Sequence, residues 1–106
     1  MPNGTHRRKT FRALHEEGCF VMPNPWDVGS AGYLQRLGFP ALATTSAGFA
    51  FSQGLPDWGD EAAISRDLAL SHIASVVAAV DLPVSADFMS GFGLRPQDVG
   101  ESVLWC

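Results

Sequence analysis

The sequence has no long hydrophobic run and little positive charge, and these two absences exclude several classes of protein. No stretch of the 106 residues reaches the roughly 18 consecutive apolar residues that a membrane-spanning helix needs. Lys and Arg total 7 against 11 Asp and Glu, and the formal net charge is −4, whereas nucleic-acid binding requires clustered positive charge. We therefore expect neither a membrane partner nor a nucleic-acid partner.

Cysteine is scarce as well. Cys19 and Cys106 are too few to form the disulfide framework of a small secreted domain. Cys19 lies within an apolar run, which predicts a buried thiol. The first 18 residues are polar and lack the apolar centre of a signal peptide. Together these features predict an enzyme-like protein of the cytoplasm.

The chain does contain an alternation of short apolar runs and longer helical patterns. The apolar runs predict strands at 19–22, 41–45 and 82–86. Helices are predicted at 10–17, 28–37 and 65–80, and from residue 95 or 96 onward, whereas 47–60 is expected to be irregular or to hold one short helical turn. The expected buried positions of the last two helices are Ala69, Ile73, Val76, Val77, Val80, Val99 and Val103.

This order of elements predicts parallel strands joined by right-handed crossovers. Each strand is followed by small and polar residues, at 24–27, 44–48 and 87–93. Because parallel strands end on one face, where ligands bind in such folds, these three segments are expected to form one side of a site. The length allows one domain only, and it is too short for a complete eight-stranded barrel, which takes about 250 residues.

Several ordered motifs stand in and between these segments. They are Gly-Phe-Pro-Ala-Leu-Ala-Thr-Thr-Ser-Ala-Gly at 38–48, Gly-Leu-Pro-Asp at 54–57, and Leu-Pro-Val-Ser-Ala-Asp at 82–87 followed by Gly-Phe-Gly at 91–93. In this order the motifs resemble those of the isocitrate lyase/phosphoenolpyruvate mutase superfamily. The resemblance is greatest to the branch that holds 2-methylisocitrate lyases, oxaloacetate decarboxylases and phosphonopyruvate-type enzymes. It implies that residues 1–106 form a single partial domain, about three βα units from the N-terminal part of a (β/α)8 TIM barrel.

The resemblance also implies a function and a site. Members of the superfamily use Mg²⁺ to break or form a bond beside a carboxylate-bearing carbon of a 2-oxo or 2-hydroxy carboxylate, through an enolate-like species. By resemblance, Thr45, Ser46 and Ala47 bind the substrate carboxylate, Asp87 holds the metal, and Asp57 belongs to the metal's outer shell. Full-length relatives are expected to be homo-oligomers. No residue of the chain is identified as a general acid or base, so the catalytic residues and the individual substrate stay unassigned.

Two departures from the superfamily pattern leave other interpretations open. Met89 stands where a second carboxylate is usual, and a thioether has little affinity for Mg²⁺. The later Glu ligand, the Lys-Lys-Cys-Gly-type loop and a substrate-binding Arg have no counterpart before residue 106. We therefore expect the chain alone to be inactive. It is then an inert fragment, for which a truncated or frameshifted gene is one explanation, or a half-barrel that needs a complementing chain.

Individual site residues have simpler interpretations too. Asp87 can serve as a turn residue, and Asp57 fits an ordinary turn equally well. The hydroxyls of Thr45 and Ser46 can satisfy local backbone groups. Asp27 is expected to be a helix N-cap rather than a catalyst. The three histidines are expected to have surface or packing roles.

Overall fold

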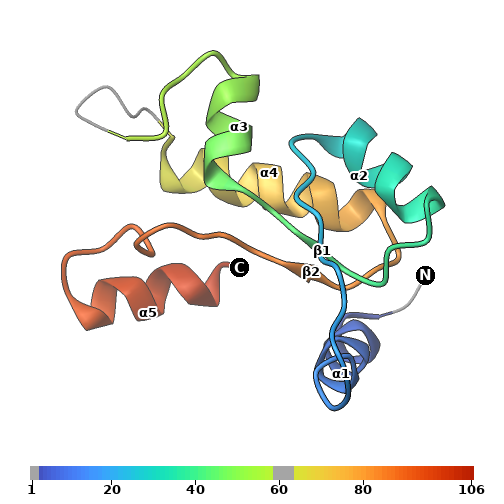
Figure 1. The fold of residues 1–106 in the computed structure, drawn as a ribbon. Helices are drawn as coiled ribbons and strands as arrows, with labels where there is room; N and C mark the ends of the chain where they lie inside the picture. Colours follow the sequence, from blue (N-terminus) through green and yellow to red (C-terminus); the bar gives the residue numbers. More distant parts are fainter. Residues whose placement is uncertain (1–2, 59–63) are drawn as a thin grey trace.

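Two short parallel strands lie at the centre of the fold, with helices arranged around them (Figure 1). The structure, a computed structural model, describes residues 3–58 and 64–106. In chain order, the elements are α1 (Gly4–Ala13), α2 (Val28–Arg36), β1 (Leu42–Ala43), α3 (Ser46–Ser52), α4 (Arg66–Ala79), β2 (Val84–Ser85) and α5 (Pro96–Leu104). Within the described ranges, no helix is both long enough and apolar enough to cross a lipid bilayer.

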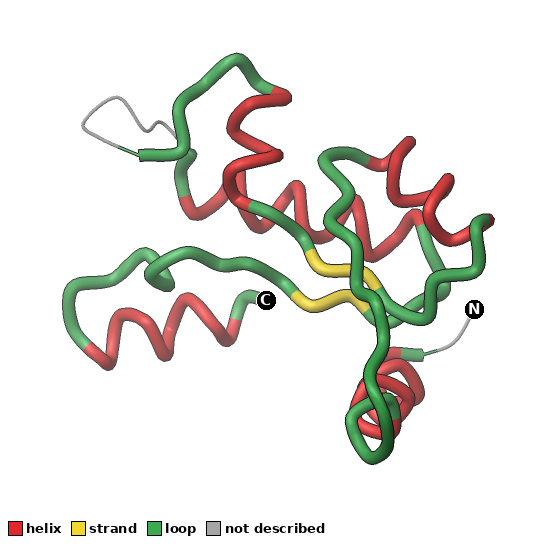
Figure 2. Tube along the Cα trace, viewed as in Figure 1, coloured by secondary structure: helices red, strands yellow, loops and turns green. Residues whose placement is uncertain are grey.

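The parallel pair β1–β2 sets the position of everything that follows each strand. Leu42 pairs with Val84 and Ala43 pairs with Ser85 (Figure 2). The Thr44 N–H extends this ladder by donating to the Ser85 carbonyl at 2.8 Å. Because the strands run in the same direction, their carboxyl ends, and the segments that begin at residues 44 and 86, emerge side by side.

The strand predicted at 19–22 was wrong. Within the described residues, only β1 and β2 form a sheet, so the expected count of three βα units is not confirmed. The preceding chain does approach β1, because the Ala43 N–H donates to the Pro23 carbonyl at 3.1 Å and the Asn24 amide donates to the Ala43 carbonyl at 3.0 Å. Pro23 and Pro25 have no N–H to donate, which prevents a regular ladder at this position.

Helices α2 and α4 begin at the caps that the sequence indicates. The Asp27 carboxylate accepts the Ser30 N–H at 2.7 Å, and the Ser65 hydroxyl accepts the Leu68 N–H at 3.2 Å. Helix α1 begins earlier than predicted because the Asn3 side chain caps it, accepting the His6 N–H at 2.8 Å. Residues 46–52 form a helix of 7 residues, where an irregular segment or one helical turn was expected.

The core lies between the strand pair and helices α2 and α4. Its fully buried members come from both helices and from β1, and they are Ala31, Leu42, Val76 and Val80. The predicted stripe along α4 is confirmed at Ala69, Ile73, Val76 and Val80, which are buried. Two burial predictions were wrong. The Cys19 thiol is exposed, and Val103 is 56% exposed because α5 turns Ser102 inward instead.

Helix α3 is held close to the chain before α2 through a glycine. A Cβ atom on Gly48 would overlap the Trp26 indole ring and the Thr45 methyl group. The Trp26 ring also packs edge-on against Phe51, with ring centroids 6.2 Å apart. The absence of a side chain at Gly48 therefore permits the close approach of two segments that both border the carboxyl ends of the strands.

We expect Gly48→Ala to lower the free energy of unfolding by about 1–3 kcal/mol, because the added methyl must displace the Trp26 ring. Gly32→Ala is the matched control, since Gly32 lies inside α2 with no atom within 4 Å of the added methyl, and it should raise stability by up to about 1 kcal/mol. Urea unfolding followed by circular dichroism measures both changes. Equal effects of the two substitutions would contradict this account of α3.

Candidate functional site

The carboxyl ends of β1 and β2 bring two of the predicted site residues into direct contact. The Ser46 N–H, at the start of α3, donates to Asp87 Oδ2 at 3.1 Å. The Met89 N–H donates to Asp87 Oδ1 at 3.1 Å. Both carboxylate oxygens of Asp87 thus accept backbone N–H groups, one from its own loop and one from the loop after β1.

Thr44 is a site residue that the sequence interpretation missed. It is only 4% exposed, and its hydroxyl oxygen accepts the Asp87 N–H at 2.9 Å. The two loops therefore hold each other, because Thr44 binds the backbone of Asp87 while the Asp87 side chain binds the backbone of Ser46. The available signal was the position of Thr44, a polar residue at the buried end of a predicted strand.

Thr45 and Ala47 are placed beside this contact, but Thr45 has a local role. Its hydroxyl caps α3 by accepting the Gly48 N–H at 3.2 Å, as the simpler interpretation of this residue expected. Ala47 lies half-buried in the first turn of α3. The turn of residues 45–47 is therefore an ordered helix start that faces the Asp87 loop.

The environment of Asp87 favours its ionised form. Partial burial acts to raise the pKa of this carboxyl, but hydrogen bonds from the Ser46 and Met89 N–H groups, and from the Ser46 hydroxyl, together hold the pKa below its ordinary value. Met89 itself has a φ of 52°, in the left-handed region that few non-glycine residues adopt. The tight loop after β2 thus keeps a charged carboxylate at the sheet end.

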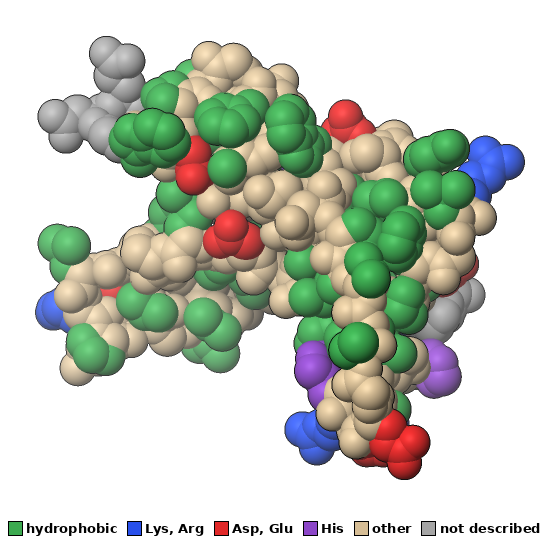
Figure 3. Space-filling model, in the orientation of Figure 1, with side chains coloured by type: hydrophobic (Ala, Val, Ile, Leu, Met, Phe, Trp, Pro, Cys, Tyr) green, Lys and Arg blue, Asp and Glu red, His purple; other side chains and the backbone are tan. Residues whose placement is uncertain are grey.

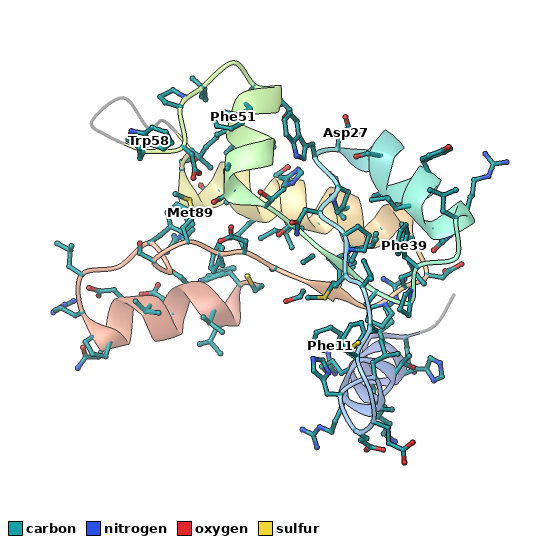
Figure 4. The ribbon with its side chains drawn as sticks, in the orientation of Figure 1. Phe11, Asp27, Phe39, Phe51, Trp58 and Met89 are labelled. Carbon is teal, nitrogen blue, oxygen red and sulfur yellow. The ribbon has the colours of Figure 1, made fainter. Side chains whose placement is uncertain are left out.

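Asp57 does not share this network. It lies half-buried in the loop after α3, next to Trp58, which Figure 4 shows on the same side of the molecule as Met89. The structure shows no hydrogen bond between Asp57 and Asp87, and within the described residues no three His, Cys, Asp or Glu side chains gather in a metal-binding group. A role for Asp57 in the outer shell of a metal would have to act through water.

The donor set at Asp87 fits a magnesium ion held by one carboxylate and several waters. Mg²⁺ keeps most of its hydration shell in proteins, and one or two carboxylates suffice to hold it. Each carboxylate oxygen has a second lone pair beside the one that accepts the N–H. The Met89 thioether, placed in the same loop (Figure 4), supplies no ligand that Mg²⁺ prefers.

A small cavity adjoins these residues. Its volume is about 10 Å³, and its walls come from both strand ends, α3 and α4: Thr44, Thr45, Ser46, Phe49, Ile64, Ala69, His72, Ile73, Asp87 and Met89. His72 is the second residue that sequence interpretation missed. The α4 stripe offered a signal, since position 72 lies three residues after Ala69 and next to Ile73.

The larger cavities lie elsewhere. One of about 630 Å³ runs between α1 and β2 and is lined by residues such as Arg7, Phe11, His15 and Val84. It contains none of the predicted site residues. Volume alone therefore does not mark the site at the carboxyl ends of the strands, which is identified by its hydrogen bonds and charge.

Comparison with known proteins identifies the family of the chain. Residues 11–105 match the family model described as phosphoenolpyruvate phosphomutase. The chain belongs to the phosphoenolpyruvate phosphomutase family. Its fold is similar to part of the barrels of the phosphoenolpyruvate mutase/isocitrate lyase superfamily.

Three relatives of this family member illustrate the match. A candidate lyase/mutase from Burkholderia cenocepacia J2315 has 53% sequence identity and a TM-score of 0.86, and the match covers 93% of this chain and 35% of that one. A 2,3-dimethylmalate lyase of the superfamily has 26% identity and a TM-score of 0.76, over 95% and 34% of the two chains. The 2-methylisocitrate lyase of Halalkalibacterium halodurans is 32% identical over 84 residues, which are 78% of this chain and 27% of the relative. The phosphomutase-family chain thus spans about a third of the length of its relatives.

The lowered pKa of Asp87 predicts a pH-dependent contribution to stability. A carboxyl whose pKa is lower in the folded state stabilises the fold fully above its ordinary pKa of 3.8, and the contribution is lost as pH falls through the lower folded value. We expect Asp87→Asn to be less stable than the wild type at pH 6, with the difference shrinking below pH 4. Urea unfolding at several pH values measures it. A difference that stays constant down to pH 3 would contradict the hydrogen bonds as its origin.

Proposed function

We propose that this chain carries the metal- and carboxylate-binding part of a Mg²⁺-dependent lyase that acts on 2-oxo or 2-hydroxy carboxylates through an enolate-like species. The observation that supports it is the direct contact between Asp87 and Ser46 at the carboxyl ends of the strands. This contact places the proposed metal ligand next to the proposed carboxylate-binding turn. Location in the cytoplasm and the homo-oligomeric state of full-length relatives stay predictions.

Each residue has a defined part in this proposal. Asp87 would be the one direct ligand of Mg²⁺, and Asp57 would bind a water of its outer shell. The metal would polarise the substrate carbonyl and stabilise the negative charge that bond cleavage leaves on it. The N–H groups of Ser46 and Ala47 would donate to the substrate carboxylate, in a turn where close approach is possible.

Binding at this turn requires Asp87 to change partners. In the structure the Ser46 N–H is already engaged by Asp87 Oδ2, so a substrate carboxylate competes with a carboxylate of the protein. A cation at Asp87 would neutralise that charge and attract the carboxylate away from the turn. Substrate carboxylate and metal are therefore expected to bind together better than either binds alone.

The substrate class follows from chemistry and from two relatives. The names 2-methylisocitrate lyase and 2,3-dimethylmalate lyase both denote cleavage of a carboxylic acid. A site with one carboxylate for a cation and the N–H groups of Ser46 and Ala47 for an anion suits such a substrate, once Asp87 has released Ser46. The residue that moves the proton is not among those placed at the site, and the chain alone is expected not to turn over.

The alternative proposal is an inert fragment, or a half-barrel completed by another chain. It is favoured by the two-stranded sheet, whose outer edges bind no further strand within the described residues, and by Met89 in place of a carboxylate. Open parallel edges are templates for pairing with additional strands. An inert fragment would lack the binding properties predicted next. A half-barrel would show them only together with the second chain.

The decisive test is binding of oxalate, a planar dicarboxylate that imitates an enolate-bearing acid. We expect the 106-residue chain to bind oxalate measurably by calorimetry in the presence of Mg²⁺ and at least tenfold more weakly in EDTA. Asp87→Ala should abolish the dependence on Mg²⁺. If oxalate binds neither with Mg²⁺ nor in EDTA, the inert-fragment proposal replaces this one. If it binds only after a complementing half of a relative is added, the half-barrel is correct.

Met89 provides a second test, which gains function rather than losing it. Aspartate tolerates the left-handed backbone at position 89 better than methionine does, and it restores a hard ligand close to Asp87. We expect Met89→Asp to tighten Mg²⁺ binding about tenfold, which corresponds to about 1.4 kcal/mol. Met89→Asn is the matched control, because it suits the same backbone but adds no charge. Equal Mg²⁺ affinities of the two variants, measured by calorimetry, would show that no metal lies at Asp87.

A further inference from the structure

A histidine of α4, His72, lies beside the proposed carboxylate-binding turn but forms no hydrogen bond with it. The His72 ring stacks on Phe49 of α3, with ring centroids 3.9 Å apart and an angle of 8° between the planes. Phe49 is itself only 8% exposed, three residues after Ser46. The stack therefore joins α4 to the short helix whose first turn contains the proposed substrate contacts.

One ring nitrogen of His72 has an unusual environment. The Nε2 atom is buried, and within the described residues it has no hydrogen-bond partner. Leaving a buried polar atom without a partner is energetically costly, so folded proteins almost always supply one, from the protein or from an ordered water. Phe or Leu at this position would stack or pack without that cost.

The cavity at the site provides room for such a partner. His72 lines it together with Thr44, Thr45, Ser46, Asp87 and Met89, and its volume of about 10 Å³ is close to the least that holds one water. A buried water needs two to four polar partners. The lining also contains the Thr44 and Thr45 hydroxyls and the Asp87 carboxylate. Each of these groups accepts a backbone N–H and keeps further hydrogen-bonding capacity.

The charge state of His72 suits a water. Burial lowers the pKa of the imidazole, and the opposing attraction of the Asp27 carboxylate is weaker. The ring is therefore neutral at pH 7, with one nitrogen that donates and one that accepts. In either tautomer Nε2 can bond to a water, which both donates and accepts.

We propose that His72 Nε2 binds one buried water in this cavity, and that His72 positions the turn of residues 45 and 46 through this water and through its stack on Phe49. His72 would then be a positioning residue, because it would act on the turn through the water and the stack and not on the substrate itself. The water site stands on the geometry alone, whereas the effect on ligand binding rests on the proposed function.

The water is tested directly by nuclear magnetic resonance. We expect a long-lived water contact at the amide protons of Thr45, Ser46 or Met89 in the wild type, and its loss in His72→Phe, which keeps a flat ring but has no Nε2. His72→Gln, with a polar end, should restore the contact in part. His15→Phe is the matched control, because His15 also contacts a phenylalanine ring, here edge-on with centroids 4.7 Å apart, but in exposed surroundings outside the site.

Two results would overturn the water site. One is the absence of the contact in the wild type, which needs no variant and stays decisive if His72→Phe fails to fold. The other is a contact that persists in folded His72→Phe. The ¹⁵N shifts of the wild-type imidazole add an independent measure, because a hydrogen-bonded Nε2 and one without a partner differ in shift.

The positioning role has a separate readout. In the presence of Mg²⁺, His72→Phe should weaken oxalate binding about fivefold, as expected for the loss of one net hydrogen bond, and His72→Gln should recover most of it. Unchanged affinity in His72→Phe, with the water lost, overturns the positioning role and leaves the water site intact. If the wild type binds no oxalate at all, the proposed function and the positioning role both fail, while the water contact still decides the first half.

Discussion

The parallel pairing of β1 and β2 is the interaction on which the rest of the molecule depends. It comprises only two residue pairs, yet it sets the level at which both following loops leave the sheet. The hydrogen bond from the Asp87 N–H to the Thr44 hydroxyl and the one from the Ser46 N–H to the Asp87 carboxylate exist only because that level is shared. Helices α2 and α4 stabilise the pairing because Ala31, Val76 and Val80 form one buried cluster with Leu42 of β1. Figure 1 shows both helices on the same side of the strand pair.

The small core also leaves large hydrophobic side chains exposed on the surface. Hydrophobic side chains remain exposed over α3 and around the strands, as the green areas of Figure 3 show, and Trp58, Trp26 and Phe51 are among them. A core built on two strands cannot cover the apolar surface of every helix that surrounds it. At the strand ends, by contrast, polar groups bind one another between the two loops, since Thr44 accepts the Asp87 N–H and Asp87 accepts the Ser46 N–H.

Much of this could be predicted from the sequence, for identifiable reasons. Capping residues such as Asp27 and Ser65 act locally, so the starts of α2 and α4 were evident, and the apolar stripe of α4 follows from helical spacing. The prediction of a strand at 19–22 was wrong, although the segment is apolar as a strand should be. The prolines that follow it, Pro23 and Pro25, have no N–H to donate where the chain meets β1. Val103 and Cys19 were placed wrongly because their burial depends on neighbours that no local pattern reveals.

For the candidate site, the limit of prediction was similar. The motifs identified Ser46 and Asp87, but not that one would bind the other, since contact between residues 41 positions apart depends on the crossover geometry. Thr44 and His72 were not predicted as site residues, because a hydroxyl at a strand end and a histidine within a helix usually have structural roles. Asp57 has the position that the motif gives it, but no hydrogen bond joins it to Asp87.

The hydrogen bond from the Asp87 N–H to the Thr44 hydroxyl also has a consequence for how the chain folds. The two residues are separated by 43 positions, and the segment between them includes all of α3 and α4. Closing so long a loop costs chain entropy before any contact between its ends can offset that cost. Helices can therefore form well before the loops meet. A collapsed chain with α4 already formed would therefore have no site at all. Any ligand that binds there selects the fully closed state, and thereby shifts the folding equilibrium toward it.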